Sequence, residues 1–184
     1  MHLAAVAGIV LLPIGFWVIS TYNKLVKLRN HKEEGWSGMD VQLKRRHDLV
    51  GNLVNSVKGY MVHERGVLDE VTRLRADSQR AKSVGAYAAA ESGMMGALGR
   101  LFAVMENYPD LKASTNVVEL QNTLSELENT IQMARRYYNG TVRSLNTLIQ
   151  TFPANMVARQ FGFTEAEYFE LDNMAEREAP VTKF

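Results

Sequence analysis

Two long heptad patterns constrain the fold of this 184-residue chain more than any other feature. From Tyr22 to Tyr60, alternating steps of three and four residues meet apolar or aromatic side chains at nine of twelve positions. A second pattern runs from Val117 to Phe152, directly before Pro153, where a helix is expected to stop. A stripe of this period is buried when one helix packs against another. The sequence therefore predicts an all-α fold of about four helices, with the long helices in an antiparallel bundle.

The inward-facing positions of these patterns form the predicted seam of the bundle. They are Trp36, Met39, Leu43, Arg46, Val50 and Leu53 in the first helix, and Leu124, Leu127, Ile131, Tyr138 and Leu145 in the second. Arg46 is the charged member, and a buried arginine needs a carboxylate to offset its desolvation. We expect an ion pair with Glu119, Glu126 or Glu128, or with a carboxylate of a neighbouring subunit. A ligand-binding arginine is the alternative interpretation.

The first 22 residues predict a transmembrane helix that continues into the bundle. Residues 3–19 contain no charged or strongly polar side chain and would rise about 26 Å as a helix, close to the roughly 30 Å hydrocarbon thickness of a bilayer. A cleaved signal peptide is disfavoured, because no Lys or Arg precedes the apolar run and no A-x-A-like site follows it. A buried soluble helix is the third interpretation. The side chains that represent the span are Leu3, Val6, Ile9, Leu12, Phe16, Trp17 and Ile19.

Positive charge follows the apolar run directly. Lys24, Lys27, Arg29 and Lys32 all precede the first acidic residue, Glu33. By the positive-inside rule, this distribution predicts a single-pass protein with its N-terminus outside and its main domain in the cytoplasm. The same four side chains are expected to contact anionic lipid headgroups.

The chain divides into four predicted segments. Residues 1–22 are the anchor, 23–35 a basic juxtamembrane helix, 36–162 the helical bundle, and 163–184 an acidic C-terminal helix and tail. The clearest predicted loop is "YPDLKAST". The aromatic residues that follow the second long helix are predicted to contact a neighbouring subunit. They are Phe152, Phe161 and Phe163.

The stretch "KRRHD" at residues 44–48 is the strongest candidate for chemistry. Consecutive helical residues point about 100° apart, so its three cations cannot converge on one phosphate. For the same reason His47 and Asp48 diverge, whereas a catalytic pair needs hydrogen-bond reach. Apart from Arg46, which occupies the seam, we therefore expect a solvated helix face, in which Asp40 pairs with Lys44, and no enzymatic activity.

Other kinds of site are disfavoured. The four histidines lie far apart and there is no cysteine, so we expect no metal site and no cofactor. Gly93, Gly96 and Gly99 precede no Gly-Lys-Ser/Thr and follow no strand, which favours close helix approach over a phosphate-binding loop. "ARRYYNG" mixes cations with aromatics, but no basic domain accompanies it, so nucleic-acid binding is not expected.

Several long motifs are similar to those of one family. They are "STYNKLVKLRN", "EEGWSGMDVQLKRRHDLVGNLVNSVKGY", "GRLFAVMENYPDLKAS", "ARRYYN", "IQTFPANMVARQFGF", "EYFE" and "EREAPVTKF". Over essentially its whole length the chain resembles the LemA family. The resemblance implies a bacterial inner-membrane protein with an outside N-terminus, a cytoplasmic helical bundle and no established enzymatic activity. It supplies no catalytic residues. Gly51 stands where the family usually has a proline, so the first helix is expected to be straighter in this chain.

Two functions follow from these features. The first is a non-enzymatic scaffold that self-associates and organises or shapes the inner membrane, with the lipid bilayer and further copies of the chain as partners. The family that the chain resembles has a magnetosome-membrane protein among its relatives, which favours this function. The second is a monomeric adaptor for another membrane protein, such as a protease or an envelope-stress or signalling protein, as suggested for some family members.

Overall fold

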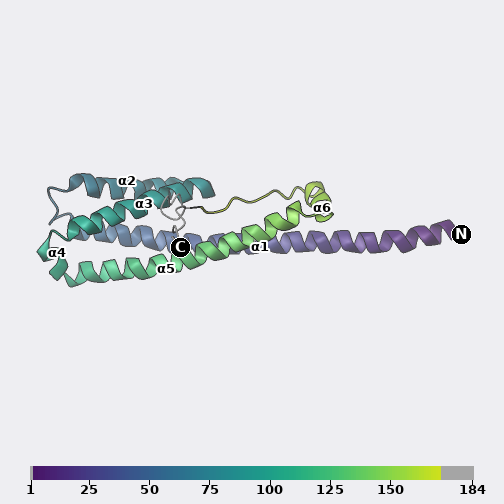
Figure 1. Ribbon diagram of the computed structural model, residues 1–184, viewed down its shortest axis with the longest axis horizontal. Coiled ribbons are helices and arrows are strands. Elements are labelled where there is room, and N and C mark those ends of the chain that lie inside the picture. The colour runs from purple at the N-terminus through teal and green to yellow at the C-terminus, as the bar shows by residue number, and fades with distance from the viewer. Residues whose placement is uncertain (1, 171–184) are drawn as a thin grey trace, which may run out of the picture. The chain divides into compact units, whose positions relative to one another are not determined.

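The computed structural model describes the backbone of residues 2–170 and the side chains of residues 12–170. Within this range the chain is all-α, as predicted, and has six helices and no strand. The helices are α1 (His2–Val57), α2 (Arg65–Arg80), α3 (Val84–Met105), α4 (Pro109–Ala113), α5 (Thr115–Gln150) and α6 (Ala154–Gln160) (Figure 1). The two short helices, α4 and α6, raise the number above the four expected.

Local sequence explains where the helices begin and end. The prediction of a loop at "YPDLKAST" is wrong over its central part, because Pro109 occupies the first turn of α4, where its missing N–H costs nothing. The second long helix, predicted from the pattern between Val117 and Phe152, is confirmed as α5, which continues unbroken through Asn139 and Gly140. Gly162 has φ +70° and follows α6, and the Phe163 N–H donates to the Ala158 carbonyl at 2.9 Å. This geometry ends α6.

The chain forms two compact units, and each contains part of α1 and part of α5. Unit 1 comprises Met1–Met39 and Ala134–Glu167, and unit 2 comprises Asp40–Met133 and Tyr168–Phe184. Residues 163–170 are not helical, and the remainder of the predicted acidic C-terminal segment, 171–184, lies outside the described residues.

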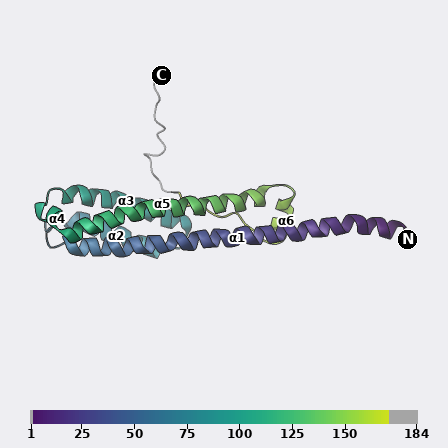
Figure 2. The same ribbon diagram turned by 90° about the horizontal axis from the view of Figure 1, so that it is seen from below.

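Unit 2 is a bundle of four helical segments, from α1, α2, α3 and α5. Successive segments run in opposite directions, and α2 packs against α3 (Figure 2). Burial of each large apolar side chain contributes roughly 1.5–3 kcal/mol, so this core stabilises unit 2. Its fully buried members include Val50, Leu53, Val57, Met61, Val71, Met94, Leu101 and Leu111.

Unit 1 has a smaller core, formed by the N-terminal part of α1, the C-terminal part of α5, and α6. Its buried residues are Leu25, Leu145, Val157 and Ala158. The segment after α6 is fixed to α5 by Asn146, whose Nδ2 donates to the Ala166 carbonyl at 2.9 Å and whose Oδ1 accepts from the Ala166 N–H at 2.8 Å. Tyr138 Oη donates to the Glu167 carbonyl at 2.9 Å. These bonds hold residues 163–167 along α5.

Gly35 allows α1 and α5 to approach closely within unit 1. A Cβ atom at this position would lie 3.3 Å from the Tyr138 Cα. One residue further along α1, the Trp36 ring meets the Tyr138 ring edge-to-face at a centroid distance of 5.5 Å. Two predicted seam positions, one from each long helix, therefore pack on one another.

No helix in the described part of the chain contains a stretch long and apolar enough to cross a membrane. The transmembrane helix predicted for residues 1–22 is thus not confirmed. Three of its representative residues, Leu3, Val6 and Ile9, lie outside the described side chains.

Candidate functional site

Five side chains form a polar cluster inside unit 2, and they come from all four helical segments of the bundle. They are Arg46 and His47 of α1, Ser78 of α2, Glu91 of α3 and Glu128 of α5. The first four are buried, and the side chain of Glu128 is 25% exposed. Buried polar groups of this kind are stable only when they are paired.

Glu91 is the centre of the polar cluster. Arg46 Nη2 donates to Glu91 Oε2, while Arg46 Nη1 donates to Glu128 Oε2 at 2.5 Å. The second oxygen, Glu91 Oε1, accepts from Ser78 Oγ and lies 2.7 Å from His47 Nε2. A single carboxylate therefore connects α1, α2 and α3, and Glu128 adds α5.

The imidazole of His47 is neutral in this environment. Burial, followed by the positive charges of Arg46 and Arg75, lowers the pKa of His47 to about 4. At neutral pH the ring then donates from Nε2 to Glu91, and Arg46 supplies the positive charge of the polar cluster. Burial also lowers the pKa of Arg46, while Glu128 opposes that shift. The guanidinium keeps its charge because arginine is not deprotonated in proteins.

Serine, histidine and glutamate are the residue types of a hydrolytic triad, but their geometry differs from one. In a triad, the serine and the carboxylate contact opposite nitrogens of the imidazole. In this structure Ser78 Oγ, at 3.0 Å, and Glu91 Oε1 both approach Nε2 of His47. Ser78 and Glu91 are also completely buried. The arrangement ties helices together and does not present a nucleophile to a substrate.

The sequence-based interpretation of "KRRHD" needs one correction. The prediction of a solvated position for His47 is wrong, because α2 and α3 cover a wider face of α1 than the seam alone. Lys44 and Asp40 pair as predicted, at 2.5 Å. Arg46 meets Glu128, one of the three expected acids, and also Glu91, which the seam pattern did not indicate. Glu91 has a signal of its own, since it is the one charged residue in the stretch 84–99.

Other predicted seam residues lie as follows. All except Trp36 are buried, in unit 1 or in unit 2.

The glycines predicted to permit close helix approach differ in their surroundings. At Gly93 an added Cβ would lie 3.1 Å from Cδ2 of Leu74. At Gly99 an added Cβ would have nothing within 4 Å.

A groove of about 510 Å³ adjoins the polar cluster in unit 2. Its apolar wall includes Met95, Leu98 and Phe102 of α3, and Arg46 and Glu128 also line it. Arg46 already contacts two carboxylates, so the groove offers no excess positive charge to an anionic ligand. No group of His, Cys, Asp and Glu in the described part of the chain is arranged to hold a metal ion.

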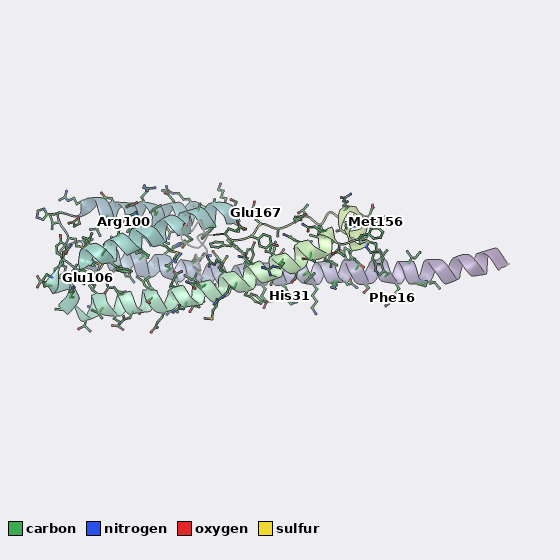
Figure 3. All side chains as sticks on the ribbon, in the orientation of Figure 1. Phe16, His31, Arg100, Glu106, Met156 and Glu167 are labelled. Carbon is green, nitrogen blue, oxygen red and sulfur yellow. The ribbon has the colours of Figure 1, made fainter. Side chains whose placement is uncertain are left out.

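In unit 1, those predicted membrane-contacting residues of α1 whose side chains the structure describes are exposed. Leu12 and Phe16 are each 76% exposed and Ile19 is 61% exposed, whereas Trp17 is less so. Figure 3 labels Phe16 on α1. Among the predicted lipid-contacting cations, Lys24, Lys27 and Arg29 are exposed and Lys32 is half-buried. The Arg29 guanidinium carbon also lies 5.4 Å from the centre of the Phe163 ring, at cation–π distance.

The aromatic residues predicted to contact another subunit occupy different environments in unit 1. The Phe161 and Phe163 rings meet the Tyr22 ring edge-to-face, at centroid distances of 4.9 and 5.8 Å. Phe152 is exposed. Two of the three aromatics thus pack within the chain.

Comparison with known proteins identifies the family to which the chain belongs. The sequence profile of the LemA family matches residues 35–184. The chain belongs to the LemA family. Among its relatives are magnetosome proteins MamQ 1 and MamQ 2 of Paramagnetospirillum magneticum, each 26% identical over an alignment 179 positions long; the alignment covers 83% of this chain. The chain spans 66% of the length of these two relatives, just under two thirds. Protein LemA of Metamycoplasma hominis is 29% identical over an alignment 160 positions long; the alignment covers 84% of this chain and 71% of that protein.

The LemA family match covers the polar cluster but not the exposed N-terminal part of α1. It includes every residue of the polar cluster and the whole of α6. It begins at residue 35, after the exposed apolar residues of α1 and the four cations that follow them. The polar cluster is therefore part of the LemA-type bundle, while the N-terminal part of α1 precedes it.

Proposed function

We propose that this LemA family protein is a non-enzymatic, membrane-associated helical scaffold, anchored at the bacterial inner membrane by residues 1–22. The observation that carries the proposal is the exposure of large apolar side chains on α1. They are Leu12, Ile14, Phe16, Trp17 and Ile19. Because successive residues turn by about 100°, these side chains point to several sides of the helix. One partner helix would cover only one side, whereas lipid surrounds them all.

The charges that follow support a bilayer as the surrounding medium. Lys24, Lys27 and Arg29 are exposed on the next two turns of α1. Each cation near an anionic membrane surface contributes about 1 kcal/mol to binding. The excess of positive charge on this side also supports a cytoplasmic main domain and an outside N-terminus in a single-pass arrangement.

The non-enzymatic part of the proposal rests on the polar cluster. Its only serine and histidine are buried and share one carboxylate oxygen, which suits helix packing and not catalysis. The names of the relatives, magnetosome protein MamQ and protein LemA, state no reaction.

Membrane association is tested by alkaline extraction of membranes from cells that express the full chain. We expect the protein to remain with the membrane, and Ile14→Lys together with Phe16→Lys to release most of it. The matched control is Val41→Lys together with Met133→Lys, two exposed apolar positions of unit 2. Equal extraction of both variants would contradict a membrane role for α1.

Orientation has a separate test. The chain has no cysteine, so His2→Cys introduces a single thiol. An impermeant maleimide should label it in intact spheroplasts. Labelling only after lysis would reverse the proposed topology.

Self-association is the second part of the proposal, and through it the scaffold would organise or shape the membrane. Exposed apolar side chains in unit 2, Tyr60, Val62 and Val118, support it, because a second copy could cover them. Electron microscopy of the full chain in mild detergent should show multi-subunit particles. Uniformly monomeric particles would instead favour an adaptor for another membrane protein.

A further inference from the structure

We propose that unit 1 touches the membrane at a second place, through a patch formed by Phe152, Met156 and Phe161. This α6 patch comprises one residue of the preceding turn, one of α6, and one directly after α6. The inference rests on the proposed membrane association of α1 and extends it to a part of the chain more than 130 residues away. The α6 patch is proposed to contact the boundary between the lipid headgroups and the acyl chains of the bilayer.

The α6 patch is exposed although its residues are large and apolar. Phe152 is 76%, Met156 64% and Phe161 52% exposed. The opposite side of α6 is buried through Ala154, Val157 and Ala158. Thus α6 is held by one face in the core of unit 1 and turns apolar side chains outward on the other.

Contacts within unit 1 fix the position of α6 along α1. Val157 and Ala158 belong to the core that includes Leu25, and Val18 packs against that core. The Phe161 ring lies 4.9 Å from the Tyr22 ring. Helix α6 therefore lies beside residues 18–25 of α1, where the apolar run ends and the cations begin. Figure 3 labels Met156 on α6 and Phe16 on the adjoining part of α1.

This position determines the depth of α6 in a membrane. Residues of α1 up to about Ser20 belong to the apolar run proposed to enter the hydrocarbon. A helix packed beside residues 18–25 must then lie at the level of the headgroups. Apolar and aromatic side chains are stable there, where an interfacial helix buries its apolar face about 5–10 Å.

The charge of unit 1 selects lipid over a second copy of the chain as the occupant. The eight Lys and Arg residues of unit 1 exceed its four Asp and Glu residues. They are Lys24, Lys27, Arg29, Lys32, Arg135, Arg136, Arg143 and Arg159, against Glu33, Glu34, Glu165 and Glu167. A symmetric contact between two copies would bring like charges together. An anionic membrane surface instead attracts them.

The test measures the depth of single labelled positions in the full chain. The variants Met156→Cys and Phe152→Cys are labelled with an environment-sensitive nitrobenzoxadiazole dye and reconstituted into phosphatidylglycerol–phosphatidylcholine vesicles. Lipids with a spin label near the headgroup or deep in the acyl chain serve as quenchers. Phe16→Cys reports the proposed anchor, and Met133→Cys is an exposed position of unit 2. Unchanged helical circular dichroism establishes that each variant folds.

We expect the shallow quencher to reduce emission at positions 152 and 156 at least twofold, the deep quencher to act on position 16, and neither to act on position 133. Quenching at position 16 without quenching at 152 and 156 overturns the α6 contact and leaves the proposed anchor standing. No quenching at any position overturns both. Blue-shifted emission at 156 that no lipid quenches means that protein covers the α6 patch, which also overturns the proposal.

Discussion

Arg46 of α1 and Glu91 of α3 form an ion pair inside unit 2, and both side chains are almost completely buried. The other carboxylate oxygen of Glu91 also contacts two side chains, His47 of α1 and Ser78 of α2. One carboxylate therefore sets the relative register of three helices. A displacement of any of the three along its axis would leave a charged or polar group buried without a partner, which is costly.

Removing the charge of Glu91 should destabilise the bundle strongly. In Glu91→Gln, Arg46 keeps Glu128 but loses its fully buried counter-ion. We expect the free energy of unfolding to fall by about 3 kcal/mol, the lower end of the range for a broken buried pair. Urea denaturation followed by circular dichroism measures the change. The matched control is Glu126→Gln at an exposed position of α5, which should stay within about 0.5 kcal/mol of the original chain. Similar losses in both variants would show that the Glu91 charge does not hold the bundle together.

Acid should destabilise the protein through His47. The unfolded histidine binds a proton below about pH 6.5, whereas folded His47 stays neutral down to a pKa of about 4. Above pH 6.5 neither state binds the proton. Between pH 6.5 and 4 the unfolded state binds more protons, so stability falls by up to about 3 kcal/mol as the pH is lowered.

The measurement compares the original chain with His47→Gln by urea denaturation at pH 7, 6 and 5. The variant should lose less stability between pH 7 and pH 5, because it lacks the group that titrates. The exposed His63 provides the control, and His63→Gln should follow the original chain. Parallel pH profiles for the original chain and both variants would place the His47 ring in contact with solvent.

The long helices and most buried positions could be predicted from the sequence because burial repeats with the period of the helix. The burial of Leu43, Val50 and Tyr138 follows from the heptad spacing alone. The burial of His47 does not, because a helix that packs against several others buries more than its seam. The spacing does not reveal how many helices surround it. Ser78 lies in the polar stretch "RADSQR", where nothing distinguishes it from solvated neighbours. Glu91, alone among small and apolar residues, could have been found.

Two glycines of α1 should respond differently to alanine. At Gly38 an added Cβ meets nothing within 4 Å, so Gly38→Ala should raise the free energy of unfolding by about 0.5–1 kcal/mol through helix propensity. At Gly35 the same Cβ would lie 3.3 Å from the Tyr138 Cα and from the Tyr137 ring. We expect Gly35→Ala to show no gain or a loss, because the backbone of α5 must move. Thermal or urea denaturation of the two variants measures the difference. Equal stabilisation would indicate that α1 and α5 are more widely separated at this point.

Asn146 should control the order of the segment that follows α6. Its side chain accepts from the Ala166 N–H and donates to the Ala166 carbonyl, and it is buried on α5. In Asn146→Ala both Ala166 groups lose their partner, at a cost of about 1–3 kcal/mol. The Ala166 amide should then exchange its proton about 5- to 150-fold faster, as measured by hydrogen exchange in nuclear magnetic resonance spectra.

The control for this prediction is Ser144→Ala on the same helix. Ser144 Oγ donates to the Gly140 carbonyl within α5 and lies on an exposed position, so its removal should leave the Ala166 amide protected. The same segment begins with Phe163, whose ring contacts Tyr22 and Arg29. Loss of the Asn146 bonds should therefore also loosen Phe163 from α1. If Ala166 exchanges at the same rate in both variants, the segment is held by Tyr138 and the apolar contacts of Phe163, and Asn146 is not required.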